Sequence, residues 1–346
     1  MKVKIGDLTK IRTGKLDANA SSEDGQYPFF TCSRETLKIS TYSYDCECVL
    51  VAGNGDLNVK YYNGKFDAYQ RTYIIEDNGS GKLFMPYLYY FMEGYIEELR
   101  KQAIGGVIKY IKLGNLTDAL IELPSVDEQK TIVDILEKSK KVLDMRHEEI
   151  SKLDDLIKAR FVEMFGDAIH NDKGWETDEV EKLCKEIYGG GTPSKLHSEY
   201  YEDGDIPWIS SKDMKTDVLT DSQIKINQLG VDNSTARMVP INSVIMVIRS
   251  GILKHTLPVA INAVPITVNQ DLKVFIPNER VLTRFLAVQF KMHEKDILSG
   301  VRVVTADNIE FNSLKQRKLI VPPIELQQEY VSFVEQTDKS KFIRHY

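Results

Sequence analysis

The feature that most constrains this chain is an uninterrupted helical stretch of about forty residues in its middle. Ser125 and Glu128 form a capping box at its start, and neither proline nor glycine follows until Gly166. At 1.5 Å per residue such a helix forms a rod of roughly 60 Å, whereas an average helix has about 12 residues. We therefore predict a central spacer helix over residues 125–166.

One face of this helix carries apolar residues at coiled-coil spacing. Five of them recur every seventh residue and two more widen the stripe: Leu136, Leu143, Ile150, Ile157 and Met164, with Leu153 and Phe161. Ser139, Arg146 and Arg160 interrupt the stripe, and the opposite face is heavily charged. This pattern is half of a coiled-coil seam, so we expect another helix to pair with it. The alternative is a long helix that lies on a globular core.

Composition indicates a folded cytoplasmic protein. The chain has 346 residues, of which 42% are hydrophobic and 28% are charged, as is typical of two or three domains. No apolar run resembles a signal peptide or reaches the ~18 residues of a membrane span. The four cysteines lack the paired spacing of a zinc site and indicate reduced thiols; they are Cys32, Cys46, Cys48 and Cys184.

The net charge of −6 argues only weakly against a nucleic-acid partner. Residues 1–124 carry 15 basic against 16 acidic side chains, and residues 175–320 carry 18 against 19. Both segments are thus within one charge of neutrality, and a neutral domain with segregated charge can present a basic face to DNA.

The second half of the chain repeats the plan of the first. Tyr27–Phe30 matches Ile206–Ile209, and Ile121–Gln129 matches Leu319–Gln327, with further matches in the same order and a period near 198 residues in the closing part. We predict an α+β fold with two tandem copies of a β-rich mixed domain, each followed by a helix. The predicted segments are 1–124, 125–166, 167–322 and 323–346. The last helix is short, so we expect either a truncated chain or another chain over the rest of the seam.

Three motifs of the second half point to a known family. They are Gly189-Gly190-Gly191-Thr192-Pro193-Ser194, Ile206-Pro207-Trp208-Ile209-Ser210-Ser211-Lys212-Asp213 and Ile248-Arg249-Ser250-Gly251. The first half carries degenerate counterparts at Thr13–Lys15 and Tyr27–Phe30, and each half closes with a proline and a Glu/Gln-rich helix start. The chain resembles the specificity subunits of type I restriction-modification systems over nearly its whole length. The resemblance implies two target-recognition domains that each read half of a bipartite double-stranded DNA site, with their helices paired as an antiparallel coiled coil.

The same resemblance places the chemistry on partner subunits. Two methyltransferase (M) subunits would bind this chain and methylate adenine, and restriction (R) subunits would cleave. S-adenosylmethionine, ATP and Mg are expected on those partners, with no cofactor bound directly here. The residues agree, since there is no Asn-Pro-Pro-Tyr methyltransferase motif and no Gly-Lys-Ser/Thr ending of a P-loop, and the six histidines have no metal-ligand spacing. We expect a non-catalytic DNA-specificity subunit; a homodimeric DNA-binding or scaffold module without a methyltransferase is the alternative.

Residue type suggests which side chains touch DNA. Lysines and hydroxyls suit phosphates, whereas Arg, Asn and Gln can read guanine or adenine. Candidates in the first half are Arg12, Lys15, Lys60, Gln70, Arg71 and Lys109. Those in the second are Thr192, Ser194, Lys195, Ser211, Lys212, Arg249, Lys254, Asn269, Gln270 and Arg302. We expect the loops 189–195 and 210–212 and Arg249 to share one face, because loops at one end of a sheet share a surface. The alternatives are a structural turn for the glycine loop and pairing with a buried acid for Arg249.

Overall fold

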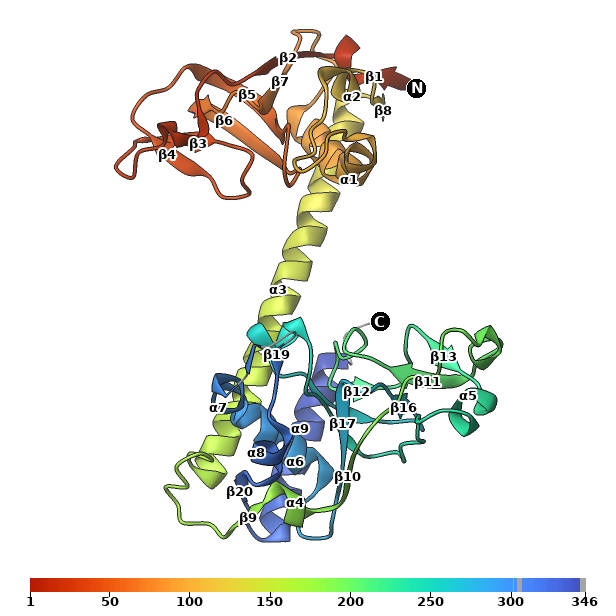
Figure 1. The fold of residues 1–346 in the computed structure, drawn as a ribbon. Helices are drawn as coiled ribbons and strands as arrows, with labels where there is room; N and C mark the ends of the chain where they lie inside the picture. Colours follow the sequence, from red (N-terminus) through yellow and green to blue (C-terminus); the bar gives the residue numbers. More distant parts are fainter. Residues whose placement is uncertain (301, 304–306, 343–346) are drawn as a thin grey trace. The chain divides into compact units, whose positions relative to one another are not determined.

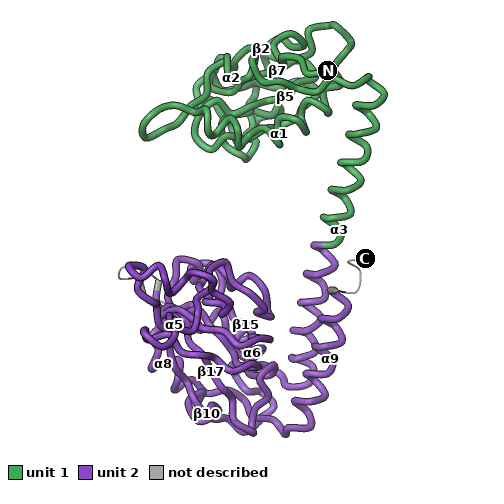
Figure 2. Tube along the Cα trace, turned by 90° about the vertical axis from the view of Figure 1, so that its right-hand side faces the viewer, with its two compact units in different colours: residues 1–146 green, residues 147–346 purple. Residues whose placement is uncertain are grey.

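A computed structural model describes residues 1–300, 302–303 and 307–342 of the protein. It separates into two compact units, residues 1–146 and residues 147–346 (Figure 2). The central helix α3 (Val126–Phe165) is continuous (Figure 1), and the boundary between the units falls inside it (Figure 2). Among the described helices, none is long and apolar enough to cross a membrane.

A six-stranded mixed sheet forms the body of the first unit, in the order β2-β7-β5-β6-β3-β4. The strands are β2 (Thr9–Thr13), β3 (Tyr27–Phe30), β4 (Leu37–Ile39), β5 (Tyr44–Ala52), β6 (Val59–Ala68) and β7 (Thr72–Asp77). Helix α1 (Met85–Gln102) packs against it, and its buried Leu88 and Met92 share a core with Val49 and Ile75. The smaller elements are β1 (Lys2–Lys4), η1 (Ile5–Asp7), η2 (Ala18–Ala20), α2 (Leu113–Thr117) and β8 (Leu120–Glu122).

The second unit is built around a five-stranded sheet, β10-β17-β14-β15-β12, and a three-stranded sheet, β13-β11-β16. Their strands are β10 (Cys184–Gly189), β11 (Ile206–Ile209), β12 (Val218–Leu219), β13 (Lys225–Ile226), β14 (Val244–Val247), β15 (Val259–Asn262), β16 (Thr267–Val268) and β17 (Leu272–Pro277). Helix α6 (Thr283–Met292) buries Phe285 and Phe290 in the core of this unit. The smaller elements are β9 (Thr177–Glu179), α4 (Val180–Leu183), η3 (Ser198–Tyr200), α5 (Gln228–Asp232), η4 (Gly251–Lys254), α7 (Glu294–Ser299), β18 (Arg302–Val303), β19 (Asp307–Asn308), α8 (Phe311–Lys315), β20 (Lys318–Ile320) and α9 (Ile324–Phe342).

The two units repeat one another in strand pairing as well as in order. Strand β3 pairs parallel with β6, and β11 pairs parallel with β16. At the end of each pair the next residue bonds back, Tyr69 N–H to the carbonyl of Phe30 and Asn269 N–H to the carbonyl of Ile209, both at 2.9 Å. The strands that enter and leave each unit also pair, β1 with β8 and β9 with β20. These shared features confirm the duplication predicted from the sequence.

A buried glutamine fastens the start of a long helix to each unit. Gln129 in α3 and Gln327 in α9 are both fully buried. Each side-chain amide donates to two backbone carbonyls and accepts from one backbone N–H. The partners of Gln129 are Lys82, Pro124 and Phe84. Those of Gln327, each 198 positions further along, are Arg280, Pro322 and Leu282. The repeat of 198 residues seen in the sequence therefore corresponds to a hydrogen-bond arrangement that occurs in both units.

Within the second unit, α9 packs against the C-terminal part of α3. The Tyr330 hydroxyl donates to the carbonyl of Ile157 (3.1 Å), and the Lys341 ammonium lies 2.6 Å from the Asp154 carboxylate. The contacts advance in opposite directions along the two helices, so these stretches run antiparallel. Helix α9 has 19 residues against 40 in α3 and is, as expected from the sequence, the shorter one.

The predicted seam residues divide into two environments. Ile157 and Phe161 are buried in the core of the second unit, with Met164 packed against them. Ile150 and Leu153 are half-buried, whereas Leu136 and Leu143 are 39% and 59% exposed. The C-terminal part of α3 thus belongs to a globular core, and the N-terminal part carries an uncovered apolar stripe.

Candidate nucleic-acid interface

In each unit, turns that follow separate strands gather at one place, which we call the turn edge; in the second unit these strands belong to both sheets. In the first unit it comprises residues 14–17, 53–56 and 69–71, and in the second residues 190–195, 210–213, 248–251 and 269–271. Backbone hydrogen bonds join the turns at equivalent places. Gly53 N–H donates to the carbonyl of Arg71 (2.8 Å), and Ile248 N–H donates to the carbonyl of Asp271 (2.9 Å). The turn edge is thus the same structure built twice.

The glycines of the two turn edges are required by close backbone approach. A Cβ at Gly190 would lie 1.8 Å from the carbonyl oxygen of Val268, and one at Gly14 would lie 2.2 Å from that of Ala68. No side chain fits at such distances, so glycine is needed at both positions. The Trp208 indole adds a second tie in the second unit, because its N–H donates to the carbonyl of Gly191 (2.9 Å). The glycine loop therefore has a structural reason for its composition.

Arg249 is held against Asp271 at the second turn edge. Its Nε and Nη2 both lie 2.6 Å from Oδ1 of Asp271. Asn269, only 7% exposed, positions that carboxylate: its side-chain amide donates to Oδ2 (3.3 Å), and its Oδ1 accepts from the Asp271 N–H (3.0 Å). Of these two expected readers, Asn269 is nearly buried, whereas Arg249 makes an ion pair with an acid and stays partly exposed.

The remaining candidates of the second turn edge are more accessible. Gln270 is exposed at the tip of its turn and accepts a hydrogen bond from the Thr192 hydroxyl, which ties that turn to the glycine loop. Lys195 and Lys212 are exposed; Ser194 caps the turn below Lys195, and Ser211 is half-buried. The structure therefore brings the loops 189–195 and 210–212 and Arg249 together around the turn 269–271.

The first turn edge presents a comparable set. Gln70 is exposed at the tip of the equivalent turn and donates to the Asp17 carboxylate (2.9 Å). Arg71 follows it, and its side chain is exposed. Lys15 is exposed directly after the glycine, and Lys109 is exposed on a segment whose backbone bonds to Gly55 (3.0 Å). Four cationic or amide candidates thus lie close together.

Four other candidates lie in different settings. Arg12 on β2 pairs with Glu76 (2.7 Å) and lies over a tyrosine ring. Lys60 is half-buried and donates to two neighbouring groups, and burial lowers its pKa. Lys254 is exposed in η4. The backbone of Arg302 lies in β18, but its side chain falls outside the described residues.

Sequence reasoning missed Asp271 and Asn54. A carboxylate counts against DNA contact when residues are considered singly, because phosphates repel it. In the structure, backbone hydrogen bonds and bridges align Asp271 with Arg71 and Arg249 with Asn54.

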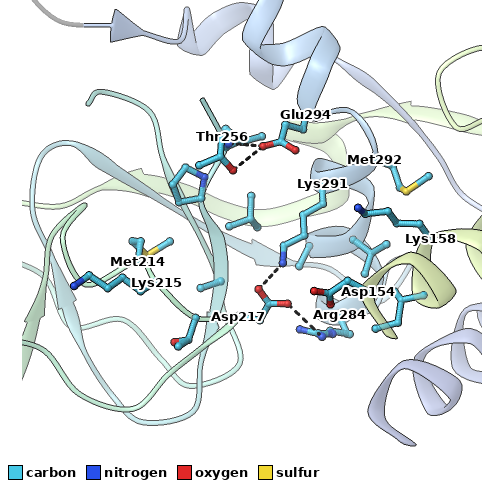
Figure 3. Close-up of a pocket in the computed structure, with 18 of the residues that line it drawn as sticks. Asp154, Lys158, Met214, Lys215, Asp217, Thr256, Arg284, Lys291, Met292 and Glu294 are labelled. Atoms are coloured by element: carbon cyan, nitrogen blue, oxygen red, sulfur yellow. Dashed lines mark hydrogen bonds and ion pairs between the residues drawn. The ribbon is translucent and has the colours of Figure 1, made fainter. Parts of the chain in front are cut away.

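The second unit also contains a pocket of about 890 Å³ between α3, α6 and the segment 214–217 (Figure 3). Lys291 lies 2.5 Å from Asp217, with Arg284 at 3.8 Å, and Glu294 accepts from the Thr256 hydroxyl. Burial opposes ionisation of Asp217, but Lys291 and Arg284 hold its pKa below the usual value. The pairs tie α6 to the 214–217 segment as a structural brace. Among the described residues, no group of His, Cys, Asp and Glu could hold a metal ion.

Comparison with known sequences assigns both copies of the repeated domain to one family. The family model described as the type I restriction modification DNA specificity domain matches twice, over residues 1–154 and 172–344. The type I restriction enzyme EcoR124I/EcoR124II specificity subunit of Escherichia coli is 30% identical over 285 residues, which are 80% of this chain and 68% of the relative. The EcoDI specificity subunit of Escherichia coli is 44% identical over 135 residues, which are 39% of this chain but only 30% of that relative.

Solved structures show the same fold. The S subunit of a type I restriction-modification system from M. genitalium superposes with a TM-score of 0.61 at 15% identity, covering 99% of this chain and 90% of that one. A chain from a study of complex assembly and conformational transition of the type I R-M system gives 0.52 at 16% identity, with coverage of 99% and 90%.

The fold is that of a two-domain protein: the same domain, with the same turn edge, occurs twice, and one continuous helix connects the two copies. Because the family model covers nearly the whole chain, the protein belongs to the type I restriction-modification DNA specificity family. This confirms the resemblance found in the sequence.

Proposed function

We propose that this chain recognises a bipartite double-stranded DNA site, each unit reading one half-site through its turn edge. The observation that carries the proposal is the repetition of that edge, with exposed cationic and amide side chains, in two units linked by one continuous helix. Two equivalent reading surfaces on one chain suit a split site, since protein geometry then sets the half-site spacing.

The accessible residues suit both kinds of DNA contact. Lys15, Lys109, Lys195 and Lys212 are exposed cations that can neutralise phosphates without regard to sequence. Gln70 and Gln270 lie at the tips of equivalent turns and offer an amide group to base edges. Within each unit, affinity and selectivity would therefore depend on different side chains.

The chemistry would belong to partner subunits. The exposed stripe that includes Leu136 and Leu143 offers an apolar surface to two methyltransferase subunits, and the α3–α9 contacts support an antiparallel coiled coil. Adenine methylation and cleavage would then use S-adenosylmethionine, ATP and Mg held by the methyltransferase and restriction subunits.

The test is selection from a library of fully randomised duplex DNA by the chain together with its methyltransferase subunits. We expect the bound pool to converge on two short motifs at a fixed separation. A pool with no sequence preference would refute recognition, and a single continuous motif would refute the bipartite reading.

A homodimeric scaffold is the second candidate, because another copy of the chain could cover the same exposed stripe. Analytical ultracentrifugation of the chain with and without methyltransferase subunits separates the two. The first proposal requires assembly with those subunits; a stable dimer that does not bind them would favour the scaffold.

A further inference from the structure

The two turn edges differ in charge at a structurally equivalent pair of positions. Gly53 and Ile248 are equivalent. Each donates its N–H to the turn that precedes β7 or β17, and the carbonyl of each accepts from a later segment at 2.9 Å. The next residues are Asn54 and Arg249, and both form an isolated bridge to that later segment. The residues that accept those N–H bonds are Arg71 and Asp271. An Asn–Arg pair in the first unit thus corresponds to an Arg–Asp pair in the second.

Asp271 holds the Arg249 side chain in place, and some of the guanidinium N–H groups are not used in that contact. Asp271 Oδ1 binds Nε and one side of Nη2. Among the described residues, Nη1 has no hydrogen-bond partner. One of its N–H groups and the outer N–H of Nη2 therefore form a parallel pair of donors. The Arg249 side chain remains 48% exposed. The backbone is held as well, since its N–H donates to the carbonyl of Asp271 (3.3 Å).

We propose that Arg249, positioned by Asp271, reads a guanine in the half-site of the second unit and that the first unit lacks this reader. The inference rests on the proposed function and names the base that one part of the turn edge selects. Arg249 makes the base contact, whereas Asp271 acts through it as a positioning residue.

Guanine matches the donors that remain. It presents two adjacent acceptors, O6 and N7, in the major groove, so two parallel N–H donors can bind both at once. Adenine presents one acceptor beside an N–H donor, and cytosine presents a donor, so neither satisfies the pair. Because Asp271 already holds the side chain, less rotamer freedom is lost on binding than for an unsupported arginine.

Random-duplex selection with the full chain and its methyltransferase subunits tests the inference. The variants are Arg249→Ala, Arg249→Lys, Asp271→Ala and Asp271→Asn. We expect the wild-type motif to contain a guanine whose preference falls about 5- to 150-fold in both Arg249 variants, which corresponds to 1–3 kcal/mol. Arg249→Lys keeps the charge and loses the fork. Both Asp271 variants should weaken preference at that same base pair, and Asp271→Asn less than Asp271→Ala.

Glu186→Ala is the matched control. Glu186 also binds an arginine, Arg237, through two contacts of 2.5 and 2.9 Å, and Arg237 stacks on a tyrosine of β10 rather than lying on the turn edge. The Glu186→Ala variant should leave every base preference unchanged. Circular dichroism of each variant checks folding, and the two conservative variants serve if an alanine variant fails to fold.

The outcomes separate this inference from the proposed function. If the wild type selects no motif, recognition itself fails and the inference fails with it. A wild-type motif whose guanines all survive in Arg249→Ala or Arg249→Lys overturns the inference alone. Loss of preference at many positions together in the Asp271 variants would give Asp271 a general structural role and refute its specific positioning of Arg249.

Discussion

At the scale of single residues, the equivalence of Asn54 with Arg249 and of Arg71 with Asp271 allows a reader to be transplanted. The double variant Asn54→Arg with Arg71→Asp places an arginine and its carboxylate support at the same backbone positions of the first unit. We expect it to add guanine preference of about 5-fold or more to the first half-site, as selection from random duplexes would detect. Asn54→Arg alone lacks the support and should give a weaker preference. If both variants keep the wild-type motif, the two edges do not read DNA through equivalent positions.

His293 gives the second residue-scale prediction. It is only 2% exposed at the junction of α6 and α7, and burial, followed by the nearby Arg317, lowers its pKa to about 4 from the ordinary 6.5. Asp296 and Asp167 act in the opposite direction but do not reverse the shift. Between about pH 6.5 and 4 the unfolded chain binds a proton that the folded chain does not. The free energy of unfolding should therefore fall as pH drops through this window, by at most about 3 kcal/mol.

The measurement is denaturant unfolding at a series of pH values for the wild type and His293→Gln. The variant should lose this part of the acid dependence, because its side chain does not titrate. His170→Gln is the control: His170 is exposed, and Asp167 raises its pKa, so its contribution has the opposite sign and is lost as pH rises through the folded-state pKa. Equal acid slopes in the wild type and His293→Gln would contradict the prediction.

At the scale of elements, the buried glutamines determine how each long helix joins its unit. Each of Gln129→Leu and Gln327→Leu removes three hydrogen bonds, made by a buried amide, and leaves their backbone partners facing an apolar side chain. We expect each to lower the free energy of unfolding by about 2–5 kcal/mol, measured by urea denaturation. Gln336→Leu, at an exposed position of α9, should change it by less than about 0.5 kcal/mol. A loss in the buried variants no larger than in this control would show that the amides do not fasten the helices.

The exposed stripe of α3 is the second element with a testable role. Leu143→Glu together with Ile150→Glu should leave the chain folded, since Leu143 is 59% exposed and Ile150 half-buried, yet prevent assembly with methyltransferase subunits. Burying two unpaired carboxylates in an interface is costly. Lys141→Glu changes the net charge by the same −2 and lies about 200° around the helix from Leu143, so it should assemble normally. Size-exclusion chromatography distinguishes them; an intact complex with the double variant would refute the seam.

At the scale of the whole molecule, local and repeated features could be predicted and tertiary partners could not. The helix expected over 125–166 is found at Val126–Phe165, because a capping box and the absence of glycine and proline act locally. The repeat was visible because Gln129 and Gln327 keep the same spacing to their partners. The burial of Asn269 and the pairing of Arg249 with Asp271 depend on strands that meet only in the fold. Residue types therefore pointed to the segments of the turn edge, but they did not show which side chains there are buried or already paired with another residue.

The repeated attachment of helix to unit predicts that recognition is modular. Among the described residues, the Gln129 side chain hydrogen-bonds only to backbone groups of the first unit, at Lys82, Phe84 and Pro124. A foreign domain with the same backbone can therefore make the same hydrogen bonds. A chimera with residues 1–124 from another family member should therefore fold and direct methylation to a hybrid site. That site should keep the original second half-site, including its guanine, and take its first half-site from the donor, as methylome sequencing would show. The parent donor is the control for the new half-site. If both half-sites change, each unit influences what the other reads, and independent recognition by the two turn edges is refuted.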